Sequence, residues 1–114
     1  MSQAADTIPF PRSGRVQINV SVEVNVTAVT ARRKVNAFLA THLGNLLLAD
    51  EPALTITDRV VWRVPVDLTN VVDGRIGRAG EVDVDVESGE LLLSEEQMTR
   101  IEKNALHLAA SSPL

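Results

Sequence analysis

The chain has 114 residues, with 11 Lys and Arg against 15 Asp and Glu, a net charge of -4, and no Cys. The net acidity argues against nucleic acid or an anionic membrane as a partner. The absence of Cys excludes disulfides, thiolate zinc sites and cysteine nucleophiles. This length suits one domain, and its core must be built from Val, Leu, Ile and Ala because aromatic residues make up only 3% of the chain.

The chain ends carry little periodicity. Residues 1–14 mix Ser, Gln, Pro and Gly, which predicts a flexible tail, followed by a single domain over 15–110 and a short tail over 111–114. The first residues lack the basic start and apolar run of a secretory signal, and no segment approaches the roughly 20 apolar residues of a membrane span. We therefore predict a cytoplasmic protein without membrane contact.

From residue 16 the chain alternates between aliphatic and polar side chains. The aliphatic positions are Val16, Ile18, Val20, Val22, Val24 and Val26. This alternation predicts a long N-terminal strand with one apolar face and one face in water. Because the strand has no proline and no inward charge, its edge is open to pairing with a second copy or another chain.

The period then changes to that of a helix, which Thr27 or Thr30 can cap. The apolar stripe consists of Val35, Phe38, Leu39, Leu43, Leu46 and Leu47, and the residues expected to face away are Arg32, Arg33, Lys34 and Asn36. An amphipathic helix is predicted over about 29–48, and Gly44 with Asn45 can end it or bend it.

Three strands and a second helix are predicted after Pro52. Leu54–Thr57 and Val60–Leu68 have the composition of strands, Thr69–Ala79 is typical of a long hairpin loop, and Glu81–Glu87 alternates again. A further short strand over Leu91–Leu93 is possible. A capping box at Ser94–Gln97 starts a helix whose apolar stripe is Met98, Ile101, Ala105, Leu108 and Ala109.

These elements predict an α+β fold. It has a long N-terminal strand, a helix, an antiparallel sheet of three to four further strands, and a C-terminal helix packed on one sheet face.

Four carboxylates lie on one face of a predicted strand, at Glu81, Asp83, Asp85 and Glu87. A straight row does not converge on one ion as the ligands of a Ca²⁺ site do. We therefore favour a solvated face paired across strands with Arg63 or another base. The alternative is a small metal-dependent or ligand-binding protein that uses the acidic strand Glu81–Glu87.

Other polar features give weaker indications of chemistry. His42 and His107 have no companion at a ligand spacing, so both are predicted to be half-buried structural residues. Arg32–Lys34 is typical of a solvated helix face. Gly74, Gly77 and Gly80 superficially resemble a phosphate loop, but they lead into a strand rather than a helix, which favours a flexible hairpin tip. We therefore predict no catalytic, cofactor-binding or metal-ligating residues, and no cofactor.

Residues 35–93 resemble a PepSY-like domain. The resemblance lies in a helix, the strand Val61–Val66, a loop, and the segment Gly80–Asp85 that leads through a Gly-containing turn into Leu91. It implies a helix lying across a curved antiparallel sheet and a role in binding or restraining another protein. The family has no catalytic residues to carry over, and the N-terminal strand and the C-terminal helix lie outside the resemblance.

The sequence therefore predicts a protein-interaction or regulatory module rather than an enzyme. We expect a protein partner, no nucleic acid and no membrane. A homodimer is expected to form through a strand edge or through an apolar helix face.

Overall fold

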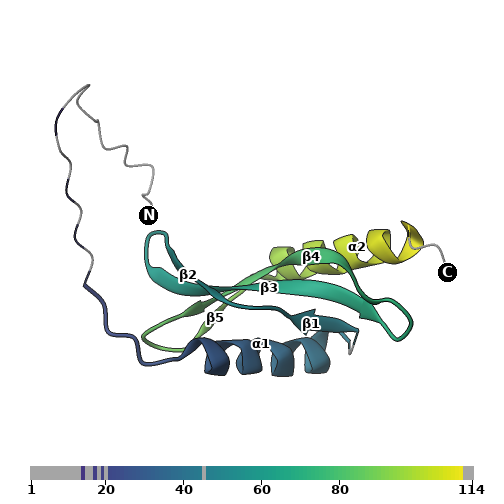
Figure 1. The fold of residues 1–114 in the computed structure, drawn as a ribbon, viewed down its shortest axis with the longest axis horizontal. Coiled ribbons are helices and arrows are strands. Elements are labelled where there is room, and N and C mark those ends of the chain that lie inside the picture. The colour runs from purple at the N-terminus through teal and green to yellow at the C-terminus, as the bar shows by residue number, and fades with distance from the viewer. Residues whose placement is uncertain (1–13, 15–16, 18, 20, 45, 112–114) are drawn as a thin grey trace.

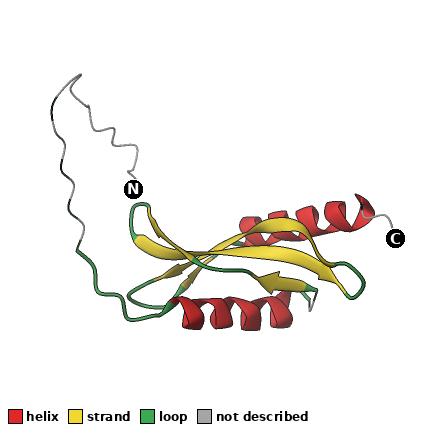
Figure 2. Ribbon diagram, in the orientation of Figure 1, coloured by secondary structure: helices red, strands yellow, loops and turns green. Residues whose placement is uncertain are grey.

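The computed structural model describes residues 14, 17, 19, 21–44 and 46–111. The elements are α1 (Ala28–His42), β1 (Leu47–Ala49), β2 (Ala53–Ile56), β3 (Val60–Asn70), β4 (Gly74–Asp85), β5 (Leu91–Leu92) and α2 (Glu95–Ser111). The described residues form two helices and one antiparallel sheet, which confirms the predicted α+β fold. Figures 1 and 2 show how the helices lie against the sheet.

Strand β3 is the centre of the five-stranded sheet. On one side it pairs along its length with β4, and on the other side β1 and β2 share its edge, with Leu47 opposite Leu68 and Ala53 opposite Arg63. The short strand β5 pairs with the far side of β4. The sheet is therefore essentially one long hairpin with short strands added at both of its edges.

One face of this hairpin forms the core. Val66 of β3 lies opposite Gly80 of β4, and a Cβ atom placed on Gly80 would meet Ile101 of α2. The buried side chains of α1, including Val35 and Leu39, belong to the same apolar cluster as Val66 and Ile101. Both helices therefore contribute to one core, and the C-terminal helix packs on the sheet as predicted.

Both helix starts are capped by side chains. Thr27 is the cap of α1, because its Oγ1 accepts from the Thr30 N–H at 3.1 Å. At α2, the Ser94 N–H donates to Gln97 Oε1 and the Gln97 N–H donates to Ser94 Oγ, at 2.8 and 3.1 Å. The predicted capping box is confirmed in both directions.

The prediction of a long N-terminal strand is wrong for the part that the structure describes. Residues 21–27 form no strand. Their backbone is attached to the body where the N–H groups of Asn25 and Val26 donate to Val86 O, where the Glu23 N–H donates to Glu87 Oε2, and where Val26 O accepts from Trp62 Nε1. Val16, Ile18 and Val20 lie outside the described residues. Alternation gives a strand only where a neighbouring edge accepts it, and residues 21–27 have no strand partner in the single copy.

Two further boundaries differ from the prediction. The first helix ends at His42 rather than near residue 48, because Gly44 adopts a φ of 115° and the chain turns into β1. The predicted loop Thr69–Ala79 is mostly strand, since β3 continues to Asn70 and β4 begins at Gly74. Strand β4 also ends at Asp85, so Glu87 lies beyond it.

The predicted tails fall almost wholly outside the described residues. Gly14 is the one described residue of the first tail, and Ser111 of the second is the last residue of α2.

Candidate interaction surfaces

The acidic strand is paired with arginines across the sheet face that lies away from the core. Arg63 donates from Nε and Nη2 to the two carboxylate oxygens of Asp83, at 2.9 and 3.0 Å, and its Nε lies 3.7 Å from Glu81. The Asp83 carboxylate raises the pKa of Arg63. This arrangement confirms the predicted pairing with Arg63.

The last carboxylate of β4, Asp85, is bonded to the backbone of the following turn. Its Oδ1 accepts from the N–H groups of Ser88 and Glu87 at 2.9 and 2.8 Å, and Arg59 Nη1 lies 3.2 Å from its Oδ2. The backbone donors at Ser88 and Glu87, followed by the Arg59 charge, hold the pKa of Asp85 below its usual value. Asp85 therefore has a local structural role.

A second charged cluster was missed in the sequence. Asp67 is only 5% exposed, and the Nε atoms of Arg75 and Arg78 lie 2.9 and 2.6 Å from its carboxylate. Asp50 accepts from Arg75 Nη2 at 2.9 Å. Register shifts in the β3–β4 ladder bring these residues together, and no alternation in the sequence indicates where such shifts occur.

The histidines and the basic cluster lie on the surface. His42 is exposed rather than half-buried and stacks on Phe38, with ring centroids 4.4 Å apart, and His107 is also exposed. Arg33 and Lys34 are exposed as predicted. Arg32 does not face away from the fold, because it contacts β1.

The glycine run is a packing surface rather than a hairpin tip. Gly77 and Gly80 lie within β4 under α2, where added Cβ atoms would lie 2.9 Å from Leu108 Cδ2 and 2.7 Å from Ile101 Cγ1. Gly74, with a φ of 73°, is the first residue of β4, directly after the turn. The glycines therefore allow a helix to approach the strand closely.

Among the described residues, no cluster of three or more His, Cys, Asp and Glu side chains is placed to hold a metal ion. None of the helices in that part of the chain has the length and apolar character needed to cross a membrane.

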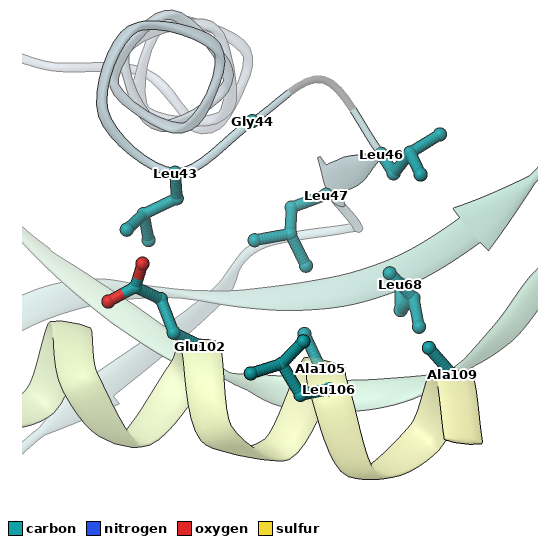
Figure 3. A pocket seen from close by; sticks show the side chains of 9 residues that line it. All are labelled: Leu43, Gly44, Leu46, Leu47, Leu68, Glu102, Ala105, Leu106 and Ala109. Atoms are coloured by element: carbon teal, nitrogen blue, oxygen red, sulfur yellow. The ribbon is translucent and has the colours of Figure 1, made fainter. Parts of the chain in front are cut away.

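An apolar groove lies between the end of α1, β1 and the second half of α2, with a volume of about 340 Å³. Figure 3 shows Leu47 and Leu68 at its floor and Leu106 on the α2 side, with Glu102 directed from α2 towards Leu43. Leu106 is 71% exposed. The groove can admit one or two apolar side chains from outside.

Two edges of the sheet are covered by helix side chains. At β1, the Ala49 N–H donates to Asn36 Oδ1 at 2.8 Å, and Arg32 Nε donates to Ala49 O at 3.2 Å. At β4, Asn104 of α2 donates from Nδ2 to Ala79 O at 2.9 Å. Bonds of this kind occupy backbone groups that would otherwise pair with another strand.

The edge of β2 has no such cover. Within the described part of the chain, β2 pairs only with β3, and its four residues, Ala53–Ile56, include no charge and no proline. Leu54 and Ile56 are 54% and 62% exposed. Figure 1 places the β2–β3 turn at the opposite end of the molecule from the β3–β4 turn.

Comparisons with known proteins add no relatives, since no family model, no curated protein and no solved structure matches this chain.

Proposed function

We propose that this protein is a non-catalytic interaction module that self-associates through the edge of β2. The observation that carries the proposal is the contrast between this edge and the other two. Arg32, Asn36 and Asn104 of the helices occupy backbone groups of β1 and β4. In the described part of the chain no helix side chain bonds to β2, whose one side-chain bond is the local one from Thr55 Oγ1 to Ala53 O, and β2 has no charge of its own. Unprotected strand edges pair with other strands.

Side-chain exposure around β2 supports the same surface. Leu54 lies opposite Trp62, whose Nε1 donates to Val26 O, and Val29 in the first turn of α1 lines a small cavity with Pro52. Val29, Leu54 and Ile56 are all exposed in the single copy. A partner strand along β2 would satisfy the backbone groups of the edge and remove these apolar side chains from water.

The apolar groove beside α2 is the second surface on which copies could meet. It corresponds to the helix-face mode of association, and β2 corresponds to the strand-edge mode. We favour the edge because, among the described residues, β2 has a strand partner on one side alone, while Leu43, Leu47 and Leu68 of the groove already pack on the core. The resemblance to a PepSY-like domain stays a prediction, and it points to the same class of function, which is binding to another protein.

Two matched substitutions separate the two modes. Ile56→Lys adds a charge to the β2 edge, and Leu106→Lys adds the same charge to the groove at a residue of similar exposure. Sedimentation velocity across a concentration series measures the monomer–dimer equilibrium. We expect Ile56→Lys to weaken self-association by at least about tenfold, because the charge must be desolvated at the interface, and Leu106→Lys to leave it unchanged.

Both variants should melt within a few degrees of the wild type, since both side chains are largely exposed. Loss of the dimer in Leu106→Lys alone would move the interface to the groove. A wild-type protein that stays monomeric throughout the series would refute self-association.

A further inference from the structure

We infer that the occupant of the β2 edge is the alternating segment 16–24 of a second copy, so that two molecules exchange their N-terminal strands. This inference rests on the proposed function and names the partner at the same surface. Two observations support it. The edge of β2 is uncovered, and the alternating segment has the composition of a strand but has no strand partner over its described residues.

The chemistry of the segment matches that of the edge. Its aliphatic residues recur at every second position, as the side chains on one face of a strand do, and its only charged residue is Glu23. Strand β2 has the same alternation on a small scale, with Leu54 and Ile56 on one face and Ala53 and Thr55 on the other. Pairing the two would join apolar to apolar faces without bringing like charges together.

The described end of the segment is in the state that this pairing requires. Val24 is 49% exposed, and residues 21–24 belong to no strand. The chain becomes part of the body at Asn25 and Val26, whose N–H groups donate to Val86 O at 2.8 and 3.1 Å. Of the described residues before Asn25, none belongs to the sheet of its own copy, and the Glu23 N–H makes a single long bond of 3.4 Å to Glu87 Oε2 in the turn after β4.

The attachment point lies at the end of the sheet that carries β2. Val86 donates its N–H to Val60 O at 3.3 Å, and Val26 O accepts from Trp62 Nε1, with Trp62 opposite Leu54 of β2. The β2 edge of the same copy and that of a second copy are therefore the two edges open to the segment, and disulfide trapping distinguishes them. Nine extended residues span about 30 Å, which is sufficient to reach a neighbouring copy's β2 when two copies lie edge to edge.

The lack of Cys in the chain permits a direct test by disulfide trapping. One preparation carries Ser21→Cys and the other carries Thr55→Cys with a tag of different mass. Both positions lie on the polar faces of their segments, so paired strands in the register that places them opposite each other bring the two Cβ atoms within bonding range. After mixing and mild oxidation, mass spectrometry identifies which chains are joined.

We expect the mixed Ser21→Cys with Thr55→Cys dimer to be the main product. Glu23→Cys, on the same face two residues later, tests the register, and Thr99→Cys on exposed α2 is the matched control that should not bond to Thr55→Cys. A Thr55→Cys dimer joined to itself would show β2 pairing with β2 and overturn the exchange. An internal disulfide in the Ser21→Cys/Thr55→Cys double variant at high dilution would show folding back and also overturn it.

The test also separates this inference from the proposed function. If Ile56→Lys abolishes the dimer but no disulfide forms from residue 21 or 23, self-association through β2 stands and the exchange is refuted. As a second measurement, a synthetic peptide of residues 15–27 in tenfold excess should convert wild-type dimer to peptide-bound monomer. The same peptide with Val22→Lys and Val24→Lys should not, and equal effects of the two peptides would count against strand exchange.

Discussion

The two faces of β4 belong to the same alternating strand, but different physical constraints determine which residues each face can carry. On the core face, Gly77 and Gly80 leave room for α2, and the constraint is volume. On the opposite face, Arg78 and Asp83 pair with Asp67 and Arg63 of β3, and the constraint is charge. A steric fit and an ion-pair network thus share one strand. Substitutions on one face should change stability through volume, and substitutions on the other face should change it through charge.

The largest expected effect is on the steric face. Gly80→Ala places a Cβ atom 2.7 Å from Cγ1 of the buried Ile101, so α2 must shift, and we expect the free energy of unfolding to fall by about 2–3 kcal/mol. Gly77→Ala meets the flexible end of Leu108 and should cost less than about 1 kcal/mol. Urea unfolding measures both. A more stable Gly80→Ala protein would mean that α2 is not held close to β4.

On the charged face, Asp67→Asn should have the next largest effect. It removes the buried charge that two arginines share, and we expect a loss of about 1–2 kcal/mol in the free energy of unfolding. Glu81→Gln is the control, because Glu81 is exposed and lies 3.7 Å from Arg63, and it should change stability by less than about 0.5 kcal/mol. Equal effects of the two substitutions would show that burial of Asp67 contributes nothing.

The smallest effect concerns pH. The folded pKa of Asp85 lies below its unfolded value, so the ionised carboxylate stabilises the fold above about pH 4, and this contribution is lost as the pH falls through the folded pKa. Asp85→Asn should therefore cost about 1 kcal/mol at neutral pH, and this difference should shrink as the pH falls below about 4. Thermal unfolding of both proteins between pH 7 and pH 2.5 measures the difference. A constant difference over that range would exclude the carboxylate charge as its cause.

The sequence predicts those parts of the fold that depend on local periodicity and capping. The central strand, the second helix and its capping box, and the Arg63–Asp83 pairing all follow from neighbouring residues or from alternation. The glycines of β4 were misinterpreted because Gly usually marks a turn, and only the position of α2 shows why Cβ atoms are excluded at Gly77 and Gly80.

The candidate surface was less accessible to prediction than the fold. Alternation in residues 16–26 indicates edge pairing, while the complementary edge, β2, is predicted only as a short strand over Leu54–Thr57 and lies at Ala53–Ile56. The lack of charged residues in β2 is visible in the sequence. Whether an edge is covered depends on distant residues such as Asn36 and Asn104, which reach backbone groups only in the folded chain.

The two bonds from α1 to Ala49 also select the alignment of β1. This strand has only three residues, so its own ladder resists sliding weakly. A shift by one position would turn Leu47 and Ala49 out of the core and place a different peptide group opposite Asn36. Two polar side chains on the helix thus determine which residues of the strand are buried, and docking of α1 and correct alignment of β1 become a single event in folding.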